Sequence, residues 1–488
     1  MNWRAAALSA LCLVLCSATP AGAATWKDAG LGTLPAGAEQ PRLVSRADGS
    51  AVLVFNDHKI LGTGAKQTGT GRVWLRSLPA GARATWGAPT LISKPGTGRP
   101  NVVRAAVGAG GLTVVAWTSR SKEASLFVRV RPAGAKGWLP ITTLVARSVH
   151  SDALGLELVA GPAGEIHAVW TQSDHDAPCT EPDLPPTTTC EDETLHASTW
   201  DPAARRWSAP VLLLRDGASG GSETVNLAAR PDGWLVVGDF GAVQADPGSI
   251  YMGQSRSPGV AGAWGPVGTI WHWRPAADGV TGFGPGRIRL AATSSGAVAA
   301  IWTFREGEAT SEYVSVLGAD GAWGPATVLE DPTRVDPAPE PQITTDAGDR
   351  MYLVQGVRAS ATSRALSVFA SAPGLASWTS RPLGPVLSVT DAFRAATAPD
   401  GRTVIAYEKA PAGKGPFTST LSVIVGNPVT GAFSAPVRLS AAADRTETEN
   451  GVHTAGGYAG PALTITRHRA VVVWEEAGTL RSRVLALG

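Results

Sequence analysis

The sequence predicts an all-β protein that folds as a single β-propeller of eight four-stranded blades. Three observations lead to this expectation: a Trp motif that recurs along the chain, a hairpin motif with the same period, and a count of copies that lets the two chain ends share one blade. The first and last anchors of the Trp motif, at positions 26 and 433, are seven periods apart, so the period is about 58 residues, the size of one blade.

In most copies of the Trp motif, Pro follows the aromatic residue after two or three positions and an apolar strand comes next, as in WGAPTLIS from Trp86. The eight anchors are Trp26, Trp86, Trp138, Trp207, Trp264, Trp323, Trp378 and Phe433. Because aromatic side chains dominate buried contacts, we interpret the anchors as packing between blades; a ladder of tryptophans that stack on carbohydrate is the alternative.

The second motif is a strand, a turn rich in Gly and Asp, and a second strand that ends near an aromatic residue. RLVSRADGSAVLVFND and RAATAPDGRTVIAYEK are examples, whereas NLAARPDGWLVVGDF and QITTDAGDRMYLVQGV lack the aromatic residue. Short β-rich runs on either side of such a turn predict a hairpin. A third strand, such as SLFVRVRPA, follows each hairpin and completes a four-stranded unit together with the next Trp strand.

The chain ends predict how the ring closes. The last hairpin and its third strand, TLRSRVLAL, have no Trp strand after them, whereas the strand at Trp26 has no hairpin before it. We therefore expect the N-terminal strand to complete the last blade, which removes an exposed sheet edge.

Residues 1–23 have the layout of a secretory signal peptide: Arg4, an apolar run over 5–15, and the small residues 21–23. Cleavage after Ala23 would leave one propeller domain, 24–488, which we expect to be a secreted monomer. A lipoprotein anchor at Cys16 is the alternative, but Leu15 stands where such signals have a small residue. No other stretch is long enough for a membrane-spanning helix, so no membrane insertion is expected.

Two cysteines remain after removal of the signal, and they lie in an acidic loop insert, 171–196. In an oxidising compartment Cys179 and Cys190 are expected to form a disulfide. A calcium site in this insert is conceivable from the residues Asp174, Asp176, Asp183 and Asp192, but their spacing matches no known calcium loop. A solvated surface loop is the favoured interpretation, and no cofactor is predicted.

Charge excludes one class of partner. The chain has 42 basic and 40 acidic residues without a long run of either sign, so binding of nucleic acid through a basic face is not indicated.

The turn before the Trp strand reads GADGAWGP over 318–325 and GARATWGAP over 81–89. In these turns the chain resembles the bacterial repeat propellers related to sialidases and their Asp-box relatives. The resemblance spans nearly the whole mature chain and implies the propeller fold. The Ser and Asp of a true Asp box are missing, no Phe-Arg-Ile-Pro-like segment opens the mature chain, and eight units exceed the six blades of sialidases, so the resemblance does not carry over sialidase catalysis.

A position seven residues before the turn, near the start of each first strand, is predicted to lie at the mouth of the central channel. It holds Arg42, Arg104, Glu157, Asn226, Arg289, Gln342, Arg394 and Ala462, where Gln342 is counted from Asp349. Guanidinium groups recognise carboxylates through paired hydrogen bonds, so these residues predict an anion or acidic-sugar site. Sialidases, which the chain resembles, also hold a substrate carboxylate with arginines from several blades. The alternative is that these residues hydrate the channel or pair with neighbouring backbone.

Acidic residues at the ends of the second strands would lie on the same face: Asp57, Asp239, Glu408, Glu475 and Glu476. Glycoside hydrolysis needs two carboxyl groups at a defined separation, and Tyr458 would be a candidate nucleophile. Two functions follow: a binding module for a glycan or another extracellular partner, and, as the alternative, a sialidase-like glycoside hydrolase with an arginine-lined carboxylate site. Without a recognisable catalytic set, binding is the favoured prediction.

Overall fold

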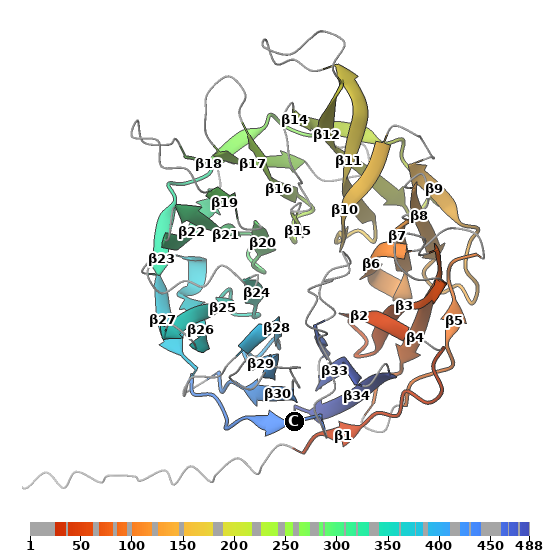
Figure 1. Cartoon of the computed structure of the whole chain (residues 1–488), viewed down its shortest axis with the longest axis vertical. Helices are drawn as coiled ribbons and strands as arrows, with labels where there is room; N and C mark the ends of the chain where they lie inside the picture. Colours follow the sequence, from red (N-terminus) through yellow and green to blue (C-terminus); the bar gives the residue numbers. More distant parts are fainter. Residues whose placement is uncertain are drawn as a thin grey trace, which may run out of the picture.

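Figure 1 shows eight β-sheets arranged as a ring around a central opening. The structure is a computed structural model, and it describes residues 25–35, 38–61, 68–81, 85–94, 100–119, 125–145, 151–178, 189–216, 226–242, 249–256, 263–273, 283–285, 288–306, 309–318, 321–330, 341–360, 363–375, 377–383, 389–409, 420–428, 431–440, 460–466, 468–476 and 479–487. All pairings within the sheets are antiparallel, and consecutive blades follow the order of the chain. The predicted eight-bladed propeller is confirmed.

The first four blades run from the innermost to the outermost strand as follows. Blade 1 contains β2 (Ala38–Ser45), β3 (Ala51–Leu61), β4 (Thr68–Leu78) and β5 (Thr90–Leu91), and blade 2 contains β6 (Pro100–Val107), β7 (Thr113–Ser119), β8 (Ser125–Arg131) and β9 (Thr142–Val145). Blade 3 contains β10 (Ser151–Ala160), β11 (Ile166–Pro178) and β12 (Thr189–Asp201), which pairs with both β13 (Arg206–Trp207) and β14 (Val211–Asp216). Blade 4 contains β15 (Asn226–Ala229), β16 (Leu235–Ala242), β17 (Ser249–Arg256) and β18 (Gly268–Trp273).

The remaining blades have the same plan. In blade 5, β19 (Phe283–Pro285) and β20 (Arg289–Ala292) both pair with β21 (Val298–Glu306), followed by β22 (Ala309–Leu317) and β23 (Thr327–Glu330). Blade 6 contains β24 (Gln342–Thr345), β25 (Met351–Ser360), β26 (Ser363–Ser371) and β27 (Trp378–Pro382), and blade 7 contains β28 (Val389–Thr397), β29 (Thr403–Lys409), β30 (Thr420–Val425) and β31 (Val437–Arg438). Blade 8 contains β32 (Ala462–Thr466), β33 (Arg469–Glu476), β34 (Thr479–Ala486) and, from the other chain end, β1 (Lys27–Asp28).

Helices are minor elements of the described chain, which contains the short 3-10 turns η2 (Ala109–Gly111) and η3 (Pro373–Leu375). None of the described helices is long and apolar enough to span a membrane.

The ring closes as predicted, because the N-terminal strand completes blade 8. Lys27 pairs with Val484, and Trp26 is buried in the core between blades 7 and 8 together with Leu485. The seam between blades 8 and 1 is also bridged by Arg469, which is 4% exposed and donates hydrogen bonds to the backbone carbonyls of Gly49, Pro79 and Gly81. Closure therefore joins residues far apart in the chain and covers part of the outer edge of β34 with β1.

The Gly and Asp of the hairpin motif form one repeated turn between the first two strands. In six blades a glycine occupies the left-handed region, with φ between 83° and 91°: Gly49, Gly111, Gly164, Gly233, Gly296 and Gly401. In blade 6 Asp349 takes this place, with φ of 60°, which short polar residues tolerate better than most. In turns that contain Asp-Gly, the Asp carboxylate also accepts a backbone N–H two residues on, as in Ser50 N to Asp48 Oδ1 at 2.8 Å.

The aromatic anchors pack between blades. Trp86 of blade 1 is buried against blade 8 and donates its Nε1 hydrogen to Ser482 Oγ at 3.1 Å. Trp323, at the outer edge of blade 5, lies so close to Gly253 of blade 4 that a Cβ there would collide with the indole. The second-strand aromatics Trp117, Trp170 and Trp302 are at most 1% exposed. These contacts agree with the packing interpretation rather than with a carbohydrate ladder.

The insert 171–196 differs from the predicted surface loop. Its two arms continue β11 and β12 as a long hairpin, in which Asp174 pairs with Asp192 and Ala177 with Cys190. Strand pairing extends outward because it satisfies the backbone of both arms. Cys179 and Asp183 lie outside the described residues, as do the side chains of Cys190, Asp174, Asp176 and Asp192, so the disulfide remains a prediction. Residues 1–23 also lie outside them, so export remains a prediction as well.

Candidate functional site

The eight positions predicted to line the channel mouth occupy one register position on the innermost strands. Each pairs with the second-strand residue directly before the aromatic position of the hairpin. The pairs are Arg42 with Val54, Arg104 with Ala116, Glu157 with Val169, Asn226 with Gly238, Arg289 with Ile301, Gln342 with Val354, Arg394 with Ala406 and Ala462 with Val473. Gln342 belongs to the set because Asp349 replaces the turn glycine without changing the pairing.

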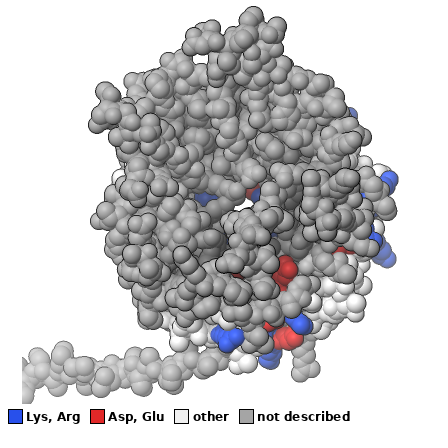
Figure 2. Space-filling model, in the orientation of Figure 1, with Lys and Arg blue, Asp and Glu red and all other residues white. Residues whose placement is uncertain are grey.

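These positions form a ring, here called the channel ring. Each innermost strand contacts the innermost strands of the blades before and after it, and together they surround the central opening (Figure 1). The seven polar members are half-buried and Ala462 is buried. Figure 2 shows that this side of the molecule is hollowed at its centre, where both basic and acidic side chains are visible.

Arg104 and Glu157 form an ion pair across the boundary between blades 2 and 3. The Nε of Arg104 donates to Glu157 Oε1 at 3.1 Å, and its terminal nitrogen lies 3.0 Å from the same oxygen. The two side chains are 26% and 24% exposed, so the pair is open to solvent on one side. Its geometry fixes the direction of the guanidinium, although such an exposed pair contributes only about 1 kcal/mol or less to stability.

Other members of the channel ring bind neighbouring backbone. Asn226 Oδ1 accepts the N–H of Leu290 in the next blade at 2.7 Å. Arg394 donates to the carbonyl of Phe393 at 2.8 Å, and Gln342 to that of Pro341 at 3.3 Å. These contacts hold the polar side chains at the channel wall. They also match the alternative interpretation, in which ring residues pair with neighbouring backbone.

Among the predicted second-strand acids, Asp57 and Glu476 each bind partners within their own blade. Asp57 is 5% exposed and accepts hydrogen bonds from Arg72 N at 2.7 Å, Arg72 Nε at 3.0 Å and Trp74 Nε1 at 2.9 Å. Glu476 lies 3.6 Å from Arg481 of the next strand. The carboxylate of Asp57 therefore accepts hydrogen bonds from a neighbouring strand of its own blade. Tyr458 and the side chain of Asp239 lie outside the described residues.

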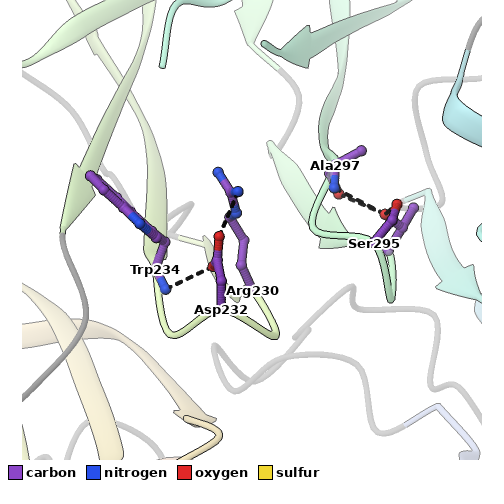
Figure 3. A network of polar contacts seen from close by, with 6 residues as sticks. Arg230, Asp232, Trp234, Ser295 and Ala297 are labelled. Carbon is purple, nitrogen blue, oxygen red and sulfur yellow. Dashed lines mark hydrogen bonds and ion pairs between the residues drawn. The ribbon is translucent and has the colours of Figure 1, made fainter. Parts of the chain in front are cut away.

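At the other end of the hairpins, the turns form a second polar network, part of which Figure 3 shows. Asp232 pairs with Arg230 at 2.7 Å and accepts the N–H of Trp234 at 3.1 Å. In blade 5 the Ser294 hydroxyl donates to Asp349 of blade 6 at 2.5 Å, and the Ser295 N–H donates to the same oxygen at 2.9 Å. This network fixes the turns of adjacent blades relative to one another.

One buried cluster was not anticipated from the sequence. Glu165, His167 and Thr199 of blade 3 meet Arg256 of blade 4, and each is at most 5% exposed. An alignment of the eight hairpins contains the signal for it, because the position of His167 is aliphatic in most other blades. The spacing of the histidines along the chain matches no catalytic set, so spacing alone does not single out His167.

Comparisons with known proteins find matches among solved structures only. No family model and no curated protein matches the chain. Similar solved structures include a Hadza microbial sialidase, Hz136, with 11% identity over 87% of this chain and 74% of the other, at a TM-score of 0.38. They also include a PL25 ulvan lyase, with 10% identity over 81% and 98% of the two chains and a TM-score of 0.45. The Penicillium chrysogenum alpha-L-arabinanase has 15% identity over 69% and 93%, with a TM-score of 0.38. These solved structures thus include a sialidase and a polysaccharide lyase.

Proposed function

We propose that this protein is an exported binding module that holds a carboxylate-bearing saccharide at the channel ring. The observation that carries the proposal is the placement of a polar side chain at the same register position on seven of eight innermost strands. Repetition of the fold requires no polar group there, as the buried Ala462 of blade 8 illustrates.

The charge of the channel ring favours an anionic ligand. Four of its members are arginines and one is a glutamate, so the ring carries three net positive charges. The carboxylate of Glu157 lies against Arg104, and the other three arginines come from blades 1, 5 and 7. A guanidinium offers two parallel donors that match a carboxylate, and amides such as Asn226 and Gln342 suit sugar hydroxyls.

A glycan array on the mature protein tests this proposal, together with a panel of fluorogenic glycosides. We expect binding to saccharides that bear carboxylates, and loss of that binding in the double variant Arg42→Ala/Arg289→Ala. Arg206→Ala, an exposed arginine on the outer strand of blade 3, is the matched control and should bind as the wild type does. Unchanged binding by the double variant across the array would remove the proposal, and turnover of a glycoside would favour the hydrolase instead.

A further inference from the structure

The boundary between blades 3 and 4 contains a histidine at a position that is otherwise apolar. His167 is the second residue of β11. Residues two positions apart in a strand lie on the same face, and Val169 packs with Val237 of blade 4, so His167 also faces blade 4. The corresponding residues of six other blades are fully buried and aliphatic: Val52, Val114, Val236, Ala299, Val404 and Val471. Blade 6 has Tyr352 there, which also binds an acid of its turn, Asp346, at 3.0 Å.

The contacts of His167 determine where its proton lies. Arg256 can only donate, and its terminal nitrogen lies 2.7 Å from Thr199 Oγ1. The Thr199 hydroxyl is thus directed to donate to Nδ1 of His167, 3.0 Å away. The ring hydrogen is then on Nε2, which faces Glu165 Oε1 at 3.5 Å. A neutral imidazole thus accepts the Thr199 hydrogen bond at Nδ1, while Nε2 lies near the Glu165 carboxylate without a hydrogen-bond partner among the described residues.

The surroundings hold the cluster in place. Glu165 is folded over Gly161, where an added Cβ would collide with its carboxyl group. On the blade 4 side, the guanidinium of Arg256 lies 6.0 Å from the ring centroid of Trp264. Other blades have aliphatic side chains at this position. Burial of charged groups there is unfavourable unless the groups pair well. The stability of the boundary between blades 3 and 4 therefore depends on the protonation state of this cluster.

We propose that Glu165, His167, Thr199 and Arg256 form an acid-sensitive latch, which holds blades 3 and 4 together at neutral pH and loosens their seam when His167 is protonated. A protonated His167 carries a hydrogen on Nδ1, directed at the oxygen that already accepts from Arg256. It also places a second positive charge next to that guanidinium. Both effects act between the blades, so the loss of stability is local to this seam.

The surroundings of His167 lower its pKa on balance. Burial lowers the pKa of His167, the Glu165 carboxylate opposes this effect, and Arg256 lowers the pKa further. The paired strands place the uncharged Val159 and Thr199 opposite it. An unfolded histidine has a pKa of about 6.5, so the unfolded state binds the proton first as the pH falls. The stabilisation is therefore complete above that value and is lost as the pH falls through the lower pKa of the folded state.

Glu165 acts in the same direction at lower pH. Its contact with His167 holds the pKa of the carboxyl group below its usual range, so folding favours its charged form. The stabilisation that it contributes is present above the ordinary carboxyl pKa of about 4.3 and disappears on further acidification.

Hydrogen exchange measured by mass spectrometry between pH 7 and pH 5, corrected for intrinsic rates, tests the latch. We expect exchange in β11 and β17 to rise relative to exchange in β3 and β29, because protonation of His167 destabilises this seam. His167→Val, which installs the residue of the other blades, should abolish the rise. His196→Gln is the control: His196 stacks on Trp170 away from the latch, and its variant should retain the rise. An equal rise in His167→Val, or a uniform rise in all blades, would overturn the proposal.

If His167→Val does not fold, NMR of the His167 ring in the wild-type protein tests the proposal. In the wild type, His167 should be the Nε2–H tautomer at neutral pH and titrate below its ordinary value. Gly161→Ala, which displaces the Glu165 carboxyl group, should shift this titration to still lower pH. A ring that titrates at or above the ordinary value, or an Nδ1–H tautomer, contradicts the latch.

Discussion

Lys27 pairs with Val484 across the seam where the two ends of the chain meet, and this pairing makes blade 8 a composite of both termini. The preceding residue, Trp26, inserts into the core between blades 7 and 8 and is 7% exposed. The ring is therefore closed by side-chain packing as well as by the β-ladder.

Trp26→Ala should destabilise the closed ring. The substitution empties a buried aromatic site, and such changes reduce the free energy of unfolding by about 3–5 kcal/mol. Urea unfolding followed by tryptophan fluorescence measures the effect. A loss below about 1 kcal/mol would mean that closure does not depend on this anchor.

Gly253→Ala should destabilise the boundary between blades 4 and 5, because the new Cβ would collide with the Trp323 indole. Overpacking of this kind reduces the free energy of unfolding by about 1–3 kcal/mol. Gly137→Ala is the matched control, since a Cβ there meets no atom within 4 Å, and it should change stability by about 0.5 kcal/mol or less. Equal effects of both substitutions in thermal unfolding would contradict this packing.

Glu157→Gln should strengthen binding of an acidic saccharide. The substitution preserves the shape of the partner of Arg104 but removes one negative charge from the channel ring. Partly exposed charges interact by about 1 kcal/mol, so we expect a gain in affinity of about fivefold by calorimetric titration. Asp232→Asn changes the net charge equally at the other end of the hairpins and should leave the affinity unchanged. Weaker binding by Glu157→Gln would show that this carboxylate itself contacts the ligand.

The predicted disulfide between Cys179 and Cys190 is accessible to peptide mapping of the exported protein without reductant. We expect a linked peptide that separates on reduction, and a loss of about 3 kcal/mol or less in the free energy of unfolding for Cys179→Ser/Cys190→Ser, because the bridge closes one short loop. Two free thiols in the exported protein would rule the disulfide out.

Repetition explains which parts of this structure were predictable. Eight copies of one hairpin allow each copy to support the alignment of the others, so the blade, the closure at Trp26 and the channel ring all follow from positions shared between copies. This holds even for Gln342 of blade 6, where the turn has no glycine. Asp349 adopts the same left-handed conformation, so Gln342 keeps the register position of the other ring members.

Features that occur once were not predictable in the same way. The arms of the insert resemble a polar loop in composition, yet backbone pairing extends them into strands as far as Ala177 and Cys190. The latch depends on an uncommon residue, His167, meeting Arg256 from the next blade, and only the packing of two blades brings them together. The composition and the repeat period predict the features that all blades share. They do not predict contacts that occur at only one boundary between blades.

The most direct test of the proposed function compares one acidic oligosaccharide with its carboxyl-reduced, neutral form in calorimetric titrations against the mature protein. The channel ring predicts that the acidic form binds and that the neutral form binds at least about tenfold more weakly, because a charge-assisted pair contributes roughly 1.5–3 kcal/mol. It also predicts that Arg42→Ala/Arg289→Ala removes this preference. Equal affinity for both forms, or an unchanged preference in the double variant, would contradict the assignment of the ring as the binding site.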